Sequence, residues 1–225
     1  MPSRLAAVAL ACLCLSAPAL AGPIASRSTL QALLGGQGTL ETFEAYAIAD
    51  GNAQVLQDCA VLDAASVCMG QGPGLVGPGL TLRSLVTLSW NGPGWEGAPS
   101  KEVLAYDSTS LAIEFTTPAQ AAGLDVRTFT DFPVTATLDV FGADLTTLLG
   151  SIEVPLPATG APQFLGWQDE AGIGRITVTQ NAWWWSPQID NVEFGAAVPA
   201  PEPASAALLG LGLAVLATRR LTPRG

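Results

Sequence analysis

Hydrophobic and polar residues alternate along the middle of the chain, which is the pattern of half-buried β-strands. The segments 39–47 and 81–90 have this period of two. Further strands, bounded by Pro, Gly or Asp, are predicted at 111–115, 124–129, 134–141, 148–154, 164–165, 173–178 and 189–194. A short helix-like stretch with Leu30 and Leu34 precedes them and ends at the glycine-rich segment 35–38. Strands at this spacing, with turn residues between them, predict an all-β fold, an antiparallel β-sandwich or jelly roll.

The first 21 residues have the composition of a secretory signal peptide. Arg4 precedes an apolar stretch from Leu5 to Leu15, and Ala19 and Ala21 occupy the positions that signal peptidase recognises. The apolar stretch is too short to span a bilayer by itself. We therefore expect a signal-peptide helix that is removed on export, leaving a mature chain that begins at Gly22.

The C-terminal segment combines three features in a fixed order: a Pro-Glu-Pro tripeptide, an apolar run and a basic end. The residues are Pro201, Glu202 and Pro203, the run 204–218, and then Arg219 and Arg220. Arginines that close an apolar segment are held on the cytoplasmic side of a membrane, so the run is expected to be a transmembrane helix. Together these features resemble the PEP-CTERM sorting signal.

This resemblance implies a route for the protein. Proteins with the signal are exported and passed to exosortase, a membrane transpeptidase-like enzyme, and many accompany exopolysaccharide or biofilm matrix. We therefore expect exosortase as processing partner and transient anchoring in the inner membrane through the C-terminal helix. Cleavage near the Pro-Glu-Pro tripeptide would then leave the protein at the cell surface or in the extracellular matrix.

The domain organisation follows from these boundaries. The expected parts are a signal peptide (1–21), a lead segment (22–38), a β-sandwich domain (39–194), a Pro/Ala linker (195–203), a transmembrane sorting helix (204–218) and a basic cytoplasmic tail (219–225). The second half of the sandwich resembles the extracellular domain found ahead of many PEP-CTERM tails, which is jelly-roll-like and akin to galactose-binding modules. The segments that carry this likeness are 122–126, 137–141, 164–166, 173–176 and 189–194.

The expected mature domain is strongly acidic. All 19 acidic residues lie within 22–203, against five basic ones: Arg27, Arg83, Lys101, Arg127 and Arg175. Such a surface repels phosphates, so nucleic acid is not an expected partner. The chain has no histidine, which excludes His-dependent triads and His-ligated metals. A pair of carboxylates arises by chance among so many acidic residues, so such a pair does not indicate a glycosidase. We therefore expect no enzyme activity.

Two cysteines, Cys59 and Cys68, lie outside the signal peptide. An oxidising compartment favours their pairing, so we predict a disulfide. No Cys-x-x-Cys spacing suggests redox catalysis.

Acidic residues on the first and last predicted strands of the sandwich suggest a cation site. In carbohydrate-binding jelly rolls, which the domain resembles, the first and last strands are neighbours, and an early Glu and a late Asp often ligate a structural calcium. Glu41, Glu44 and Asp190, with Asn191, are the candidate ligands here, because calcium prefers carboxylate and carbonyl oxygens. The alternative is that the glutamates are ordinary solvated residues and Asp190 closes a turn.

Three consecutive tryptophans, Trp183, Trp184 and Trp185, are the other candidate site. Exposed indole rings can stack on the C–H faces of sugars. The alternative is that these rings belong to the core or to a loop that closes one end of the sandwich.

The function expected from the sequence is that of an exported surface or matrix protein, without catalysis, that binds exopolysaccharide. Two alternatives remain open: a secreted carbohydrate-active enzyme, and a structural or adhesin protein that contacts other surface proteins.

Overall fold

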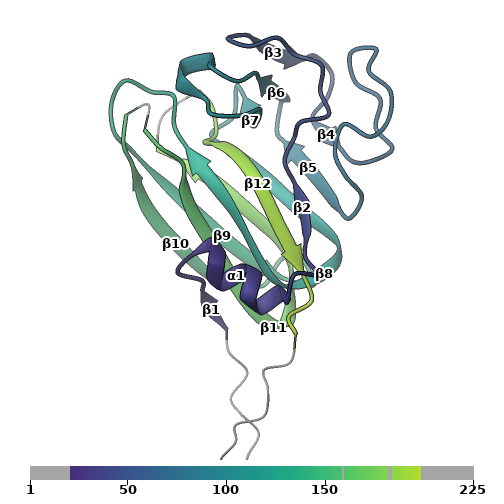
Figure 1. Cartoon of the computed structure of the whole chain (residues 1–225), viewed down its shortest axis with the longest axis vertical. Helices are drawn as coiled ribbons and strands as arrows, with labels where there is room; N and C mark the ends of the chain where they lie inside the picture. The colour runs from purple at the N-terminus through teal and green to yellow at the C-terminus, as the bar shows by residue number, and fades with distance from the viewer. Residues whose placement is uncertain (1–20, 159, 182–183, 199–225) are drawn as a thin grey trace, which may run out of the picture.

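The computed structural model describes residues 21–158, 160–181 and 184–198, and all statements below concern these residues. They form one α-helix, one short 3-10 turn and twelve strands (Figure 1). The helical elements are α1 (Arg27–Leu34) and η1 (Trp95–Gly97). The strands are β1 (Gly22–Pro23), β2 (Thr39–Glu41), β3 (Ala53–Leu56), β4 (Val61–Leu62), β5 (Leu80–Ser84), β6 (Thr87–Asn91), β7 (Glu102–Tyr106), β8 (Ser110–Arg127), β9 (Val134–Gly142), β10 (Leu148–Leu156), β11 (Gln163–Gln180) and β12 (Gln188–Gly195).

Two long strands, β8 and β11, belong to both layers of the fold. The first half of β8 pairs with the second half of β11, and these halves also pair with β5 and β9, respectively. The second half of β8 pairs with the first half of β11 and, on its other side, with β12. The register shifts between Gln168 and Ile173, where β11 has extra residues and Gly172 adopts φ 101°. Bulges bend a strand in this way, so the antiparallel sheet folds over itself. The predicted antiparallel β-sandwich is confirmed at this level (Figure 1), whereas its jelly-roll assignment stays a prediction.

The hydrophobic core lies between the layers. In β9 every second residue is buried, as the alternation predicts, with Val134, Ala136, Leu138 and Val140 facing inward. Trp90 of β6 is fully buried in this core. Its ring stacks on Tyr46 and meets Phe43 edge-on, with centroids 5.4 and 5.7 Å away, and its indole nitrogen donates to the Phe43 carbonyl.

The first predicted strand, 39–47, is shorter than expected. β2 ends at Glu41, whose buried carboxylate accepts the backbone N–H groups of Phe43 and Gly77. Phe43 has φ 55°, which takes the chain out of the extended conformation. Hydrophobic and polar residues still alternate after Glu41, but the Glu41 side chain accepts backbone hydrogen bonds and so ends the strand.

The predicted strand 81–90 is two strands. β5 and β6 are separated by Leu85 and Val86, which are exposed. β5 pairs with β4 and β8, while β6 pairs with β3 and β7, so the chain changes partners at this turn. Conversely, the predicted pairs 111–115 with 124–129 and 164–165 with 173–178 are the single strands β8 and β11. Four strands were not predicted: β1, β3, β4 and β7.

The predicted helix-like stretch is confirmed as α1. Ser26 caps its first turn by accepting the Thr29 N–H, and Gly35 ends it in the left-handed region at φ 56°. Leu30 and Leu34 are buried against β8 and β11. The helix covers the end of the sandwich where β1 begins and β12 stops (Figure 1).

Several sequence predictions fall outside the described residues: the signal-peptide helix with Ala19, the Pro-Glu-Pro motif at 201–203, the sorting helix and the terminal arginines. Ala21 is described and lies exposed next to β1. Among the described residues, no helix has the length and apolarity needed to cross a membrane.

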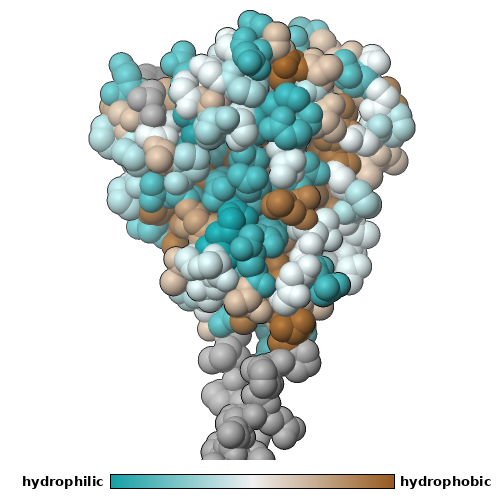
Figure 2. Space-filling view, viewed as in Figure 1, coloured by the Kyte–Doolittle hydropathy of each residue, from teal (hydrophilic) through white to brown (hydrophobic). Residues whose placement is uncertain are grey.

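The face seen in Figure 2 is mostly hydrophilic, with hydrophobic residues scattered over it rather than gathered in one large patch. Scattered apolar residues are normal on a soluble surface. The candidate site therefore has to be sought in a cavity.

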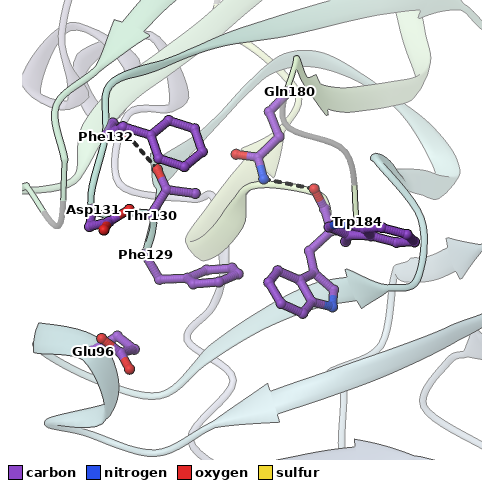
Figure 3. Close-up of a pocket in the computed structure, with 8 residues that line it drawn as sticks. Glu96, Phe129, Thr130, Asp131, Phe132, Gln180 and Trp184 are labelled. Atoms are coloured by element: carbon purple, nitrogen blue, oxygen red, sulfur yellow. Dashed lines mark hydrogen bonds between the residues drawn. The ribbon is translucent and has the colours of Figure 1, made fainter.

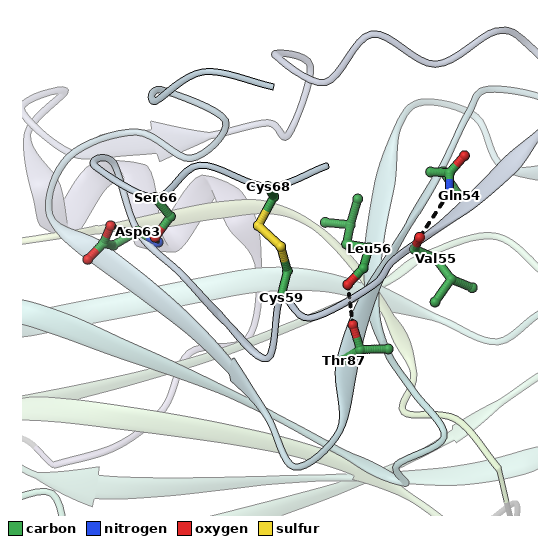
Figure 4. Close-up of a disulfide and its surroundings, with 8 residues drawn as sticks. All are labelled: Gln54, Val55, Leu56, Cys59, Asp63, Ser66, Cys68 and Thr87. Atoms are coloured by element: carbon green, nitrogen blue, oxygen red, sulfur yellow. Dashed lines mark hydrogen bonds between the residues drawn. A yellow bond between two sulfur atoms is a disulfide. The ribbon is translucent and has the colours of Figure 1, made fainter. Parts of the chain in front are cut away.

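The predicted disulfide is confirmed, since Cys59 and Cys68 are joined with Cα atoms 6.1 Å apart (Figure 4). It closes a loop that otherwise has only short strand β4 and a turn in which Asp63 and Ser66 bond each other. Both sulfur-bearing residues are buried against the core.

Replacing both cysteines, as Cys59→Ser with Cys68→Ser, is expected to lower the free energy of unfolding by about 2–3 kcal/mol, because the loop gains freedom in the unfolded chain. Urea unfolding of the oxidised full-length protein and the double variant measures this. The reduced wild type should match the variant, and an unchanged unfolding midpoint would contradict the prediction.

Candidate functional site

A pocket of about 540 Å³ opens at the end of the sandwich that lies away from α1 (Figure 3). We call it the aromatic pocket. It is lined by Glu96, Phe129, Thr130, Asp131, Phe132, Gln180, Trp184 and Trp185. These residues come from η1, from the connection between β8 and β9, from the end of β11 and from the connection between β11 and β12.

The bend in the two long strands explains why these segments meet. β8 and β11 are bent at the end near α1, so their termini return to the opposite end of the molecule. Arg127 ends β8 in one layer, and Gln180 ends β11 in the other. The two connections that follow must cross between the layers, and the pocket forms between them.

Aromatic rings form one connected cluster on the pocket wall. The Phe129 ring lies between Trp95 and Trp185, with centroid distances of 5.2 and 4.9 Å. Trp185 also contacts Tyr106 at 5.9 Å, beside a second cavity of about 90 Å³. Trp184 is 55% exposed and also lines the pocket.

A buried ion pair supports the turn that carries Glu96. The Arg127 Nε lies 2.7 Å from the Glu102 carboxylate, and both residues are almost fully buried. The same guanidinium donates to the backbone carbonyls of Trp95 and Glu96, at 3.3 and 3.1 Å. Burial raises the pKa of Glu102 to about 7, and the charge of Arg127 opposes that rise. Glu96 has φ 43°, an unfavourable conformation that these contacts help to hold.

The pocket has hydrogen-bond acceptors in Gln180, Glu96 and Asp131. The Gln180 side chain, 5% exposed, donates from Nε2 to the Trp185 carbonyl at 2.7 Å. Its Oε1 has no hydrogen-bond partner among the described residues, and Figure 3 shows it turned toward Thr130. Glu96 and Asp131 add exposed carboxyl groups. Thr130 donates to the Phe132 carbonyl and so shapes the turn.

The structure places two of the three candidate tryptophans at the pocket, and their role in glycan stacking stays a prediction. Trp184 and Trp185 line the pocket, whereas Trp183 lies outside the described residues. Sequence reasoning did not identify Phe129, Phe132, Gln180 or the two acidic lining residues. Phe129 was placed at the end of the predicted strand 124–129. For the others the available signal was their position in segments between predicted strands, where binding residues are common.

The calcium prediction placed the first and last strands side by side, and β2 does pair with β12, with Glu41 opposite Val192. The three carboxylates nevertheless have protein partners. Glu41 binds two backbone N–H groups, and Glu44 forms an ion pair with Lys101 at 3.4 Å. Asp190 accepts hydrogen bonds from Ser100 and from Asn191. In the described part of the chain, no three Asp, Glu, Cys or His residues are grouped to hold a metal ion.

Asp190 lies at a bulge in β12, where Asn191 has φ 50° and its side chain bridges Asp190 and Asp125. Burial raises the pKa of Asp190 to about 6; the hydrogen bond from Ser100 opposes the rise, while the charges of Asp125 and Glu44 add to it. Burial thus disfavours the charged form of this carboxyl group.

No protein-family model and no curated protein matches this chain. Comparison with solved structures finds a likeness to the K2 cleaved adhesin domain of Lys-gingipain, with a TM-score of 0.32 and 12% sequence identity. The match covers 70% of this chain and 98% of that one. A similarity of this size carries no conclusion about the present protein.

The raised pKa of Asp190 predicts how stability depends on pH. In the unfolded chain the carboxyl titrates at about 3.9, so between about pH 4 and 6 the folded protein binds the proton more tightly. This contribution is complete below about pH 4 and is lost as the pH rises through about 6. Melting temperatures measured in EDTA should therefore show this loss in the wild type and a flatter profile in Asp190→Asn.

Glu153→Gln is the matched control, because Glu153 is an exposed carboxylate on β10. Its profile should follow the wild type. Parallel profiles for Asp190→Asn and the wild type would contradict the assignment.

Proposed function

We propose that this protein is exported to the cell surface or extracellular matrix and binds a polysaccharide, without catalysis, in the aromatic pocket. The observation that carries the proposal is an open cavity walled by aromatic side chains with a few polar groups. Its volume lies in the range of ordinary ligand sites, about 300–1,000 Å³. Indole and phenyl faces suit the apolar faces of sugar rings, and carboxylate and amide oxygens suit their hydroxyl groups.

Export is supported by the signal peptide pattern and by the disulfide, which persists in an oxidising compartment. The PEP-CTERM-like tail favours exosortase as processing partner and the inner membrane as a transient anchor. Structural calcium near Asp190 remains part of this proposal, and a melting temperature that rises with added calcium would support it. An identical melt in chelator would remove it.

The orientation of β12 fits a tethered binding module. This strand begins just after the pocket residues Trp184 and Trp185 and ends next to the C-terminal linker. The N-terminal strand β1 starts at the same end as that linker (Figure 1). A chain anchored through its C-terminal segment would therefore present the pocket away from the membrane.

A carbohydrate-active enzyme is the second candidate, and the presence of both Glu96 and Asp131 at the pocket favours it over other catalytic classes. Glycoside hydrolysis needs two carboxyl groups on either side of the scissile bond. Release of reducing sugar from a bound polysaccharide would select this candidate. Self-assembly without any glycan would instead select a structural or adhesin role.

Trp184→Ala is expected to weaken binding to insoluble polysaccharide by about two- to tenfold, because a stacking face at the rim is lost. Pull-down of the full-length protein on a panel of insoluble polysaccharides measures this. Leu148→Ala is the matched control, since Leu148 is 54% exposed but belongs to β10 and does not line the pocket. Equal retention of both variants would place binding elsewhere.

Mass spectrometry of the protein recovered from its cells tests the sorting part of the proposal. We expect an N-terminus at Gly22, a C-terminus near the tripeptide 201–203, and joined Cys59 and Cys68. Recovery of the whole chain with its C-terminal arginines from the soluble cell interior would contradict export and processing.

A further inference from the structure

The lining of the aromatic pocket is unbalanced in charge. It contains the two carboxyl groups of Glu96 and Asp131, and no lysine or arginine lines it among the described residues. Arg127, which lies behind η1, is 2% exposed and directs its guanidinium to Glu102 and to backbone carbonyls. The pocket therefore offers a ligand negative charge without a compensating cation.

Gln180 adds a second, independent observation. Its Nε2 is engaged by the Trp185 carbonyl, which fixes the amide orientation and leaves Oε1 as a buried acceptor without a partner. A buried acceptor that lacks a hydrogen bond is unfavourable and is satisfied by a donor. Figure 3 shows this oxygen facing the pocket interior between the two connections. A ligand that brings a donor within reach of this oxygen would supply the missing hydrogen bond.

The aromatic faces favour the same kind of ligand. The rings of Phe129, Phe132, Trp184 and Trp185 all line the cavity. The negative face of an aromatic ring attracts cations, most strongly for tryptophan. Carboxylates beside aromatic rings thus form a site suited to a positively charged donor group.

We propose that the pocket selects glycans that carry a free, protonated amine, as in hexosamine units without an N-acetyl group. This inference rests on the proposed polysaccharide-binding function and names its ligand class. An ammonium group supplies three donors and one positive charge, which match Gln180 Oε1, the two carboxyl groups and the aromatic faces. A neutral sugar supplies donors but no charge, and a uronic acid meets repulsion from both carboxylates.

Isothermal titration of the full-length protein at about pH 6 and low salt compares four probes: glucosamine oligomers, N-acetylglucosamine oligomers, cello-oligomers and oligogalacturonate. We expect glucosamine oligomers to bind between about two- and thirtyfold more tightly than the neutral probes, from two partly solvated ion pairs. Oligogalacturonate should bind least. Raising the salt should reduce the preference for the amine, because exposed charges are screened.

Glu96→Gln and Asp131→Asn should each weaken the glucosamine probe by about two- to fivefold more than they weaken the neutral probes, because only the ammonium group loses an ion pair. Glu153→Gln removes one exposed carboxylate that does not line the pocket, and it should change nothing. Gln180→Met, checked by its melting temperature, should weaken all the sugar probes. The variants of the exposed residues Glu96 and Asp131 keep the test decisive if Gln180→Met does not fold.

The outcomes separate the two proposals. Equal binding of glucosamine and N-acetylglucosamine oligomers overturns the amine preference and leaves polysaccharide binding intact. Absence of binding to every probe and to the insoluble panel overturns polysaccharide binding and this inference with it. An equal loss in Glu153→Gln shows attraction to the acidic surface as a whole, and it overturns the assignment to the pocket.

Discussion

The antiparallel pairing of β8 with β11 determines most of this structure, because both strands run through both layers. Their register shift next to Gly172 bends them together near α1. That bend closes one end of the sandwich and brings the strand termini back to the other end. The chain must then cross between the layers twice, once after β8 and once after β11. A loop-lined cavity at that end is therefore a consequence of the strand pairing, and it needs no separate element to build it.

Arg127 connects this framework to the cavity. It stands at the last position of β8, pairs with Glu102 of β7 and holds two carbonyls of η1. A buried ion pair is costly to form, and removing one partner is strongly unfavourable, so its value lies in the geometry it imposes. Here that geometry includes the unfavourable backbone of Glu96 at the pocket rim. Rigid positioning by a buried pair suits a binding site whose exposed groups must face one ligand.

A second arginine, Arg27, pairs with acidic side chains of β8 and β12. Arg27 of α1 contacts Asp125 at 2.9 Å and Glu193 at 3.2 Å, and it also donates to the Asn191 carbonyl. This single arginine balances two carboxylates and ties the helix to the bulged strand. Asp190 lies on the same bulge, and burial raises its pKa although Ser100 and Asn191 donate hydrogen bonds to it. Asp125 and Glu193 are thus paired with a cation, whereas the hydrogen-bond partners of Asp190 are neutral.

By itself the sequence determined the fold class, the α1 helix, β9, β10, β12 and the disulfide, because alternation, capping residues and the cysteine pair are local signals. It also identified Trp184 and Trp185 by their clustering. The tertiary structure alone decided that β8 and β11 are continuous, that 81–90 divides, and that Glu41 ends β2. These outcomes depend on strand partners and on a side chain bonding distant backbone. The pocket belongs to the same class: Phe129 and Gln180 are 51 positions apart, and only the bend in two paired strands brings them together.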